Sequence, residues 1–199
     1  MIHPHTALKY VNEEIGYGVF ATQRIPAGTI IWVKDKLDRE LTSDEFHNLP
    51  AVCKGNVENH TFRNRKGNFI LCWDICRYMN HSFKANCLAT AYDFEIAGRD
   101  IGAGEELTDD YGYLNIIAPF EACDEGTERK IVYPDDLLRF HPIWDEQFLA
   151  LLPAVLKQEQ VLNELIPAET WEHLLEVAKG NAPLESILKN YFAELSVSR

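Results

Sequence analysis

The stretch GEELTDDYGY, residues 104–113, decides the fold of this chain of 199 residues. It begins at a glycine turn, continues as a short β-prone run, and ends with Gly112 between Tyr111 and Tyr113. A glycine between two aromatic residues lets the backbone approach a ligand closely while two rings and two hydroxyls face it. By itself the stretch favours a plainer interpretation, a strand that leaves a turn and whose aromatic side chains only pack. The rest of the sequence has to decide between these two interpretations.

The composition bounds the class of protein. The hydrophobic content of 46% allows a sizeable core, and the length fits one domain with a modest extension. The formal net charge is −12, from 31 acidic and 19 basic residues, so there is no excess of cations to neutralise the phosphates of a nucleic acid. The charge fits a basic partner such as a lysine-rich peptide or protein, although any acidic globular protein would carry it too.

The cysteines and the apolar runs indicate the compartment. The five cysteines form an odd and sparse set, Cys53, Cys72, Cys76, Cys87 and Cys123. Residues 1–5 show no basic region followed by an apolar run, and no apolar stretch is long enough to span a bilayer. We therefore expect a cytoplasmic protein with reduced thiols and no membrane association.

The first seventy residues read as β structure broken by turns. The run GYGVFA, residues 16–21, places two glycines around Tyr17, which permits a tight bend whose backbone groups stay open to a ligand. A single Gly-x-Gly does not make a dinucleotide fingerprint. Thr42 and Glu45 form a capping box that predicts a short helix ending before Pro50, and the basic residues 63–67 predict a hairpin turn.

The middle of the chain contains the run RYMNHS, residues 77–82. Asn80 and His81 are adjacent polar residues in an apolar neighbourhood, so we expect each to meet specific hydrogen-bond partners. The His81–Ser82 pair does not favour a hydrolase, because adjacent side chains rarely face each other and no Gly-x-Ser-x-Gly turn is present. Two further strands are predicted at residues 88–92 and 95–97.

The apolar period changes to a helical one after about residue 134. A helix is predicted from Pro167 to Gly180, with proline early and glycine at its end, and a last helix from Pro183 onward. We expect this region to be a helical cap that packs on the β part.

Residues 16–21, 77–82 and 104–112, in this order, closely resemble the signature segments of the SET-domain family, lysine methyltransferases that use S-adenosylmethionine. The resemblance implies a mainly β fold with some α, the SET-domain β-clip of small sheets with a pseudoknot, followed by a C-terminal helical segment. In that fold the last signature segment threads beside Asn80 and His81. We accordingly expect a SET domain at residues 7–114 and a mostly helical extension at residues 115–199 that packs on it.

The resemblance also implies the roles of individual residues. The backbone of residues 16–18 would hold the amino-acid end of S-adenosylmethionine, Asn80 and His81 would hold its amino-acid and adenine parts, and Tyr111 would stand at the methyl-transfer centre. Tyr113 either lines the lysine channel or only packs. The implied cofactor-binding residues are thus Gly16, Tyr17, Gly18, Asn80, His81 and Tyr111, with Tyr111 also the catalytic residue.

The chain departs from many family members at the structural zinc site. These have a cysteine after the Asn-His-Ser triplet and a cysteine cluster after the domain, whereas here the position is Phe83 and only Cys123 follows Tyr111. We therefore expect no zinc, and methyl transfer itself requires no metal. Something else must then close the site, and we expect residues 114–140, with Phe120, to do so.

Two other functions stay open. The first is a non-catalytic SET module that binds protein, which is disfavoured because Tyr111, Asn80 and His81 are all present. The second is methylation of a small molecule or of a side chain other than lysine.

Overall fold

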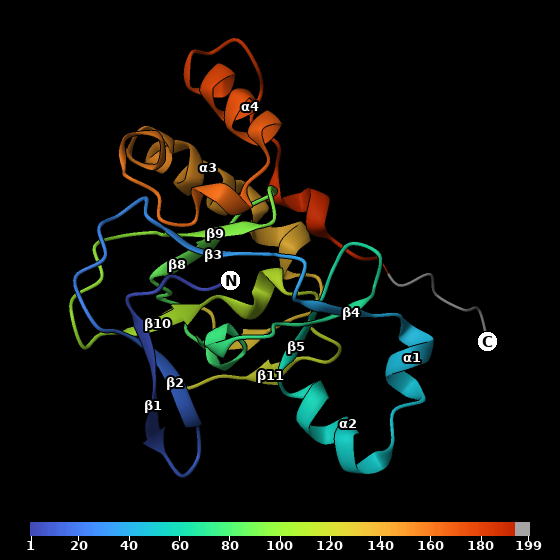
Figure 1. Ribbon diagram of the computed structural model, residues 1–199. Coiled ribbons are helices and arrows are strands. Elements are labelled where there is room, and N and C mark those ends of the chain that lie inside the picture. The colour runs from blue at the N-terminus through green and yellow to red at the C-terminus, as the bar shows by residue number, and fades with distance from the viewer. Residues whose placement is uncertain (194–199) are drawn as a thin grey trace.

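The strands form several small sheets instead of one large sheet in the computed structural model, which describes residues 1–193 (Figure 1). The first sheet has the order β1 (Thr6–Asn12), β2 (Gly16–Ala21), β10 (Glu106–Asp109), β7 (Asn80–His81). The second is β3 (Ile30–Val33), β9 (Phe94–Ala97), β8 (Cys87–Ala89). The third is β4 (Arg39–Leu41), β6 (Phe69–Leu71), β5 (Thr61–Arg63), and the last pairs β11 (Phe120–Glu121) with β12 (Ile131–Val132).

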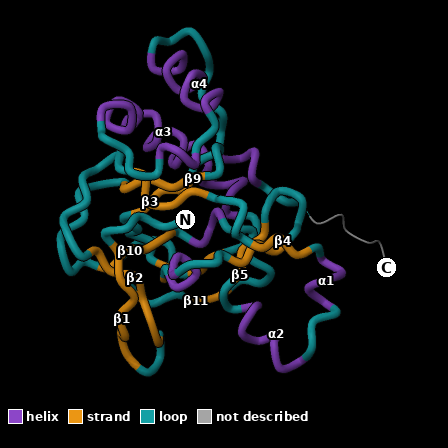
Figure 2. The backbone as a smooth tube through the Cα atoms, in the orientation of Figure 1, coloured by secondary structure: helices purple, strands orange, loops and turns teal. Residues whose placement is uncertain are grey.

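The helices lie at two places around these sheets (Figure 2). The α-helices are α1 (Ser43–His47), α2 (Ala51–Glu58), α3 (Asp136–Lys157) and α4 (Ala168–Ala178). The 3-10 turns are η1 (Ile75–Tyr78), η2 (Tyr111–Tyr113), η3 (Asn163–Leu165) and η4 (Ile187–Asn190). In Figure 1, α3 and α4 cover the sheet β3-β9-β8 at the top, whereas α1 and α2 lie apart beside β4 and β5.

The first sheet brings the three signature segments together. β10 pairs antiparallel with β2 and parallel with β7, so that Thr108 lies opposite Asn80 and Asp109 opposite His81. The Ser82 amide continues the ladder by donating to the carbonyl of Asp109 at 2.9 Å. Segments that are far apart in the sequence therefore share one edge of the structure, as the resemblance implied.

The larger core lies between the sheet β3-β9-β8 and α3. The apolar side chains that α3 buries, Leu137, Trp144, Phe148, Leu152 and Val155, recur at three-, four- and seven-residue intervals. This spacing puts them on one face of the helix, against Phe94 and Ile96 of the sheet. Each such side chain contributes about 1.5–3 kcal/mol when it is fully buried. The predicted helical cap is thus confirmed for residues 136–178 and shares its core with the β part.

Several local predictions are confirmed. Thr42 and Glu45 form the capping box, in which the Glu45 amide donates to the Thr42 hydroxyl at 3.2 Å and the Thr42 amide to the Glu45 carboxylate at 2.8 Å. Residues 63–67 lead from β5 into β6, which pair antiparallel. The strands predicted at residues 88–92 and 95–97 overlap β8 and β9, and in the turn between them Asp93 has a φ of 58°.

Two local predictions fail. The sequence did not predict α2, because that helix buries no residue and so lacks an apolar stripe. The helix predicted from Pro183 onward is wrong for the part that the structure describes: between residues 183 and 193, only the four residues of η4 are helical. Tertiary contacts hold this segment instead, since Asn115 donates to the carbonyl of Asn190 at 2.8 Å and accepts from the amide of Phe192 at 2.9 Å. Residues 194–199 of the expected extension lie outside the described residues.

Within residues 1–193, no helix is both long enough and apolar enough to cross a membrane. All five cysteines are free thiols.

Candidate active site

Tyr111 stands in the wall between two cavities. One, of about 460 Å³, lies against the β1–β2 hairpin and is lined by Gly16, Tyr17 and Asn80. The other, of about 410 Å³, lies against the third sheet and is lined by Phe62, Phe69 and Phe120. The residues that line both are Asn59, His60, Arg77, Met79 and Tyr111. Two ligands that occupied these cavities would meet at Tyr111.

Two hydrogen bonds fix Tyr111. Its hydroxyl donates to the carbonyl of Met79 at 2.6 Å, and its amide donates to Nδ1 of His81 at 3.1 Å. Burial, together with the charges of Asp109 and other neighbours, raises the pKa of Tyr111 above its ordinary value. The phenol therefore stays protonated, with lone pairs free to accept a weak hydrogen bond from a polarised C–H group.

Asn80 and Gly18 form a cradle at the first cavity. The Asn80 carboxamide donates to the carbonyl of Tyr17 at 3.1 Å and to the carboxylate of Glu106 at 2.7 Å. A Cβ on Gly18 would lie 2.3 Å from Oε1 of Glu106 and 2.9 Å from Nδ2 of Asn80. Only glycine therefore allows β2 to approach this pair, which explains the second glycine of the Gly-Tyr-Gly segment.

His81, the next residue of β7, presents a buried donor. Its Nδ1 accepts the Tyr111 amide, so we assign the proton to Nε2, and Nε2 is buried without a partner among the described residues. Burial lowers the pKa of His81, which keeps the imidazole neutral. The rings of Phe83 and Phe120 lie 4.5 and 5.5 Å from the His81 ring. An orphaned donor between aromatic rings suits a flat ligand with acceptor nitrogens, such as adenine.

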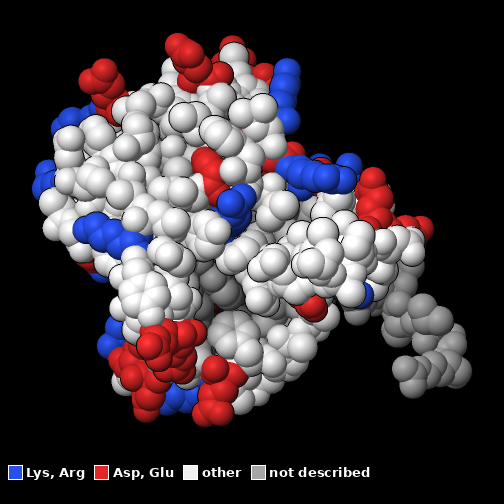
Figure 3. Space-filling view, turned by 60° about the horizontal axis from the view of Figure 1, so that its bottom comes forward, with Lys and Arg blue, Asp and Glu red and all other residues white. Residues whose placement is uncertain are grey.

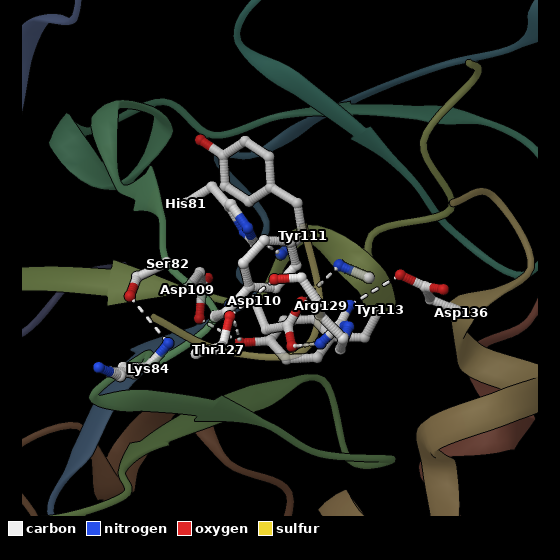
Figure 4. Close-up of polar contacts among 12 residues, drawn as sticks. His81, Ser82, Lys84, Asp109, Asp110, Tyr111, Tyr113, Thr127, Arg129 and Asp136 are labelled. Atoms are coloured by element: carbon white, nitrogen blue, oxygen red, sulfur yellow. Dashed lines mark hydrogen bonds and ion pairs between the residues drawn. The ribbon is translucent and has the colours of Figure 1, made fainter. Parts of the chain in front are cut away.

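The segment that follows residues 104–112 contains Arg129, which holds the carboxylates of Asp110 and Asp136 together beside the site (Figure 4). Arg129 pairs with both carboxylate oxygens of Asp110 and donates to Asp136 at 2.7 Å. Its guanidinium lies 4.7 Å from the centre of the Phe83 ring and 4.4 Å from that of Phe140. Asp110 immediately precedes Tyr111, so this cluster ties η2 to the start of α3.

Part of the segment 114–140 borders the site, since residues 114–118 and Phe120 line the second cavity. Phe120 lies 6.1 Å from the Tyr111 ring and lines the second cavity. Glu125 accepts the amide of Phe83 at 2.9 Å, and its carbonyl accepts the Lys84 amine at 2.5 Å. The contribution of Phe120 was expected, whereas no spacing in the sequence pointed to Arg129 or Glu125.

Tyr113 does not line either of the cavities that share Tyr111. Its ring packs against Trp144 at 5.3 Å, and its hydroxyl donates to Asp109. Of the two alternatives for Tyr113, the structure agrees with packing. Asp109 lines the second cavity in its place, together with Glu95, and neither carboxylate was a candidate from the sequence.

Among residues 1–193, no group of three or more histidine, cysteine or acidic side chains is arranged to hold one metal ion. Cys72 lies in a hydrophobic cluster against which Cys76 packs, and burial is one of the causes that raise the pKa of the Cys76 thiol, after its hydrogen bond with Cys72.

The comparisons with known proteins agree with these signature segments. The SET domain family model matches residues 16–112, a range that contains Gly16, Asn80, His81 and Tyr111. No curated protein matches the chain. Among solved structures, the chain is similar to a protein of Plasmodium falciparum described as a candidate histone methyltransferase. The two are 18% identical, with a TM-score of 0.41 over 55% of this chain and 95% of that one. Residues 16–112 of this chain therefore belong to the SET-domain family, a family of methyltransferases.

Proposed function

We propose that this protein is an S-adenosylmethionine-dependent methyltransferase whose substrate is a lysine side chain of a protein. The observation that carries the proposal is the position of Tyr111, whose hydroxyl is fixed on the Met79 carbonyl where two cavities meet. The cavity at the β1–β2 hairpin takes the cofactor, and the cavity at the third sheet takes the substrate. Both volumes lie in the range of small-molecule sites.

The residues at the first cavity fit the cofactor. The backbone of residues 16–18 and the Asn80 side chain hold its amino-acid end. The buried Nε2–H of His81, which follows Asn80 in β7 but lines neither cavity, suits its adenine. When bound, S-adenosylmethionine supplies a methyl group on a positively charged sulfur. The task left to the protein is alignment of the incoming amine in a dry channel, because methyl transfer is an in-line displacement.

Tyr111 acts by position. Its hydroxyl oxygen and the Met79 carbonyl present acceptor lone pairs at the wall between the cavities. Such acceptors attract a polarised methyl group and leave one line of approach for the amine. The contacts of Arg129 with Asp110 and Asp136 hold the backbone of η2 in place at this wall.

The charge of the surface favours a basic partner. Acidic side chains gather over the β1–β2 hairpin, beside the hollow at the centre of the view in Figure 3. Glu13 and Glu14 are exposed at the turn of that hairpin. With a net charge of −12, the field of the whole protein steers a lysine-rich peptide toward this face. We place the protein in the cytoplasm, without direct binding of nucleic acid.

Two measurements test the proposed function. Calorimetry with S-adenosylmethionine is expected to show binding at micromolar concentrations, and the labelled cofactor is expected to methylate lysines in a panel of basic proteins. A chain that binds no cofactor would be an interaction module instead. Transfer to small amines or to other side chains, but never to lysine, would support the alternative substrate class.

Replacement of Gly18 by alanine tests the cradle. The new methyl group displaces the Glu106 carboxylate and the Asn80 carboxamide, so we expect the dissociation constant for S-adenosylmethionine to rise about tenfold, equivalent to about 1.4 kcal/mol. Both displaced groups are ends of side chains, and the free energy of unfolding should change by less than about 1 kcal/mol.

The matched control is Gly55→Ala in α2, where an added Cβ meets nothing within 4 Å. This change should stabilise the protein by about 0.5–1 kcal/mol and leave cofactor affinity unchanged. If Gly18→Ala binds the cofactor as tightly as the wild type, the pair Asn80 and Gly18 is not part of the cofactor site.

A further inference from the structure

The second cavity ends in two buried carboxylates. Asp109 is 4% exposed and Glu95 is 7% exposed, and both line the cavity. At its open side, Ile117 is 52% exposed, which places the mouth there and the carboxylates at the inner end. The walls between are largely apolar, from Phe62, Phe69 and Phe120 among others.

The pair is not explained by packing. Glu95 lies on a strand whose four residues are all buried, where a carboxylate costs stability unless it is paired. Its Oε2 is buried and has no hydrogen-bond partner among residues 1–193. Asp109 accepts a hydrogen bond from the Tyr113 hydroxyl, and the carboxyl groups of Glu95 and Asp109 form a hydrogen bond with each other. Burial, and after it the charge of Asp109, raises the pKa of Glu95 well above its ordinary value, so Glu95 shares its proton with Asp109. An acid pair kept at such a cost, beside Tyr111, points to a ligand.

We propose that Asp109 and Glu95 together receive the cationic amine of the substrate and position it at Tyr111. The inference rests on the proposed function and deepens it, because it assigns the part of the site that selects an amine. A largely apolar cavity that ends in carboxylates matches a side chain with an aliphatic stem and an ammonium head. A neutral substrate of the same length leaves the buried carboxylates without a partner.

The same carboxylates provide an acceptor for the proton that the ammonium must lose before the reaction. An ammonium ion has no lone pair, so it must lose a proton before it can attack a methyl group. One N–H bond of the ammonium breaks, the proton passes to a carboxylate oxygen of Asp109, and the electron pair stays on nitrogen. Burial, with the neighbouring charge of Asp110, raises the pKa of Asp109 to about 6 even though its hydrogen bonds lower it, which brings the acceptor nearer to the working pH.

Arginines also line this cavity, so the sum of its charges alone does not select a cation. Arg63 donates to the carbonyls of Asn115 and Ile116, and Arg77 donates to the carbonyl of Cys72. The selection comes from the placement of the two carboxylates at the inner end. The titratable groups that act on this pair are the amino group of Met1 and the side chains of Cys72, Cys76, Cys87, Asp110, Tyr111 and Tyr113.

The test uses two probes of equal length, n-butylammonium and n-butanol, titrated into the full chain and followed by nuclear magnetic resonance. We expect the wild type to bind the ammonium about tenfold or more tightly than the alcohol, as a charge-assisted hydrogen bond requires. Asp109→Asn and Glu95→Gln should each lose most of this preference. Asp109→Asn keeps an acceptor for the Tyr113 hydroxyl, so we expect it to fold. Asp100→Asn removes an exposed carboxylate outside the cavity and should keep the preference.

A pH series on the wild type tests the same idea without a variant. As the pH falls from 7 to 5, Asp109 takes up a proton and the affinity for n-butylammonium should drop, whereas the affinity for n-butanol should not change. Equal affinity of the wild type for the two probes would overturn the proposal, and so would a preference that survives both substitutions. Cofactor binding is measured on the same samples. If the cofactor binds without any preference for the ammonium, the acid pair has no such role, and the proposed function stands.

Discussion

The Tyr111→Phe variant is expected to transfer methyl groups on the order of a hundredfold more slowly than the wild type, at unchanged cofactor affinity. The lost hydroxyl removes the 2.6 Å hydrogen bond to Met79 and one acceptor at the wall between the cavities. The Met79 carbonyl is then free to move, and a small displacement of reacting groups costs about 100-fold in rate. Single-turnover kinetics with labelled S-adenosylmethionine measure the chemical step, and calorimetry measures the cofactor affinity.

The matched control is Tyr92→Phe. The Tyr92 hydroxyl also has a backbone partner, the amide of Glu185 at 3.0 Å, but Tyr92 lines neither cavity of the active site. We expect this variant to keep the wild-type rate. If Tyr111→Phe and Tyr92→Phe transfer methyl groups equally fast, Tyr111 has no catalytic role in this protein.

The Arg129→Met variant is expected to lower the free energy of unfolding by about 3–5 kcal/mol, because it leaves two carboxylates buried without their cation. The side chains of Asp110 and Asp136 are 8% and 1% exposed, so water does not replace the lost partner. Methionine keeps the aliphatic volume between Phe83 and Phe140 but not the charge. Urea unfolding at equilibrium gives the magnitude.

The control for Arg129 is Arg139→Met, which breaks a pair with Asp135 whose side chains are 49% and 41% exposed. Such surface pairs contribute about 0.3–0.5 kcal/mol. Amide hydrogen exchange adds a local measurement: residues 110–113 should lose protection in Arg129→Met and keep it in Arg139→Met. Equal stability of the two variants would show that the Arg129 cluster does not hold η2 in place.

Arg129 and the buried acids affect the stability of the folded protein in opposite directions. Arg129 joins residues that are 19 and 7 positions away and stabilises the fold around Tyr111. Asp109 and Glu95 act in the opposite direction, because a buried acid whose pKa is raised weakens the folded state once it ionises. Stability from Asp109 therefore falls as the pH rises from about 4, its ordinary pKa, through about 6.

The sequence alone was sufficient for the family of residues 16–112, and it pointed to Gly16, Tyr17 and Asn80, which line the first cavity. Gly18 is required by the close approach of the backbone to Asn80, and Asn80 and His81 are neighbours in the chain. Such requirements act on individual residues within short segments, so they remain visible as motifs. The capping box at Thr42 and the helical period after residue 134 are local in the same sense.

Only the tertiary structure decided what surrounds those motifs. The spacing of Glu95 and Asp109 follows no helical or strand period, and β9 and β10 bring the two carboxylates to one cavity. The sequence around Tyr113 allowed a position in the lysine channel, but its ring packs against Trp144 of α3 in the core. The segment after Pro183 has a helical pattern, yet Asn115 fixes it in another conformation. Contacts between distant segments leave no period in the sequence, because their geometry exists only once the chain has folded.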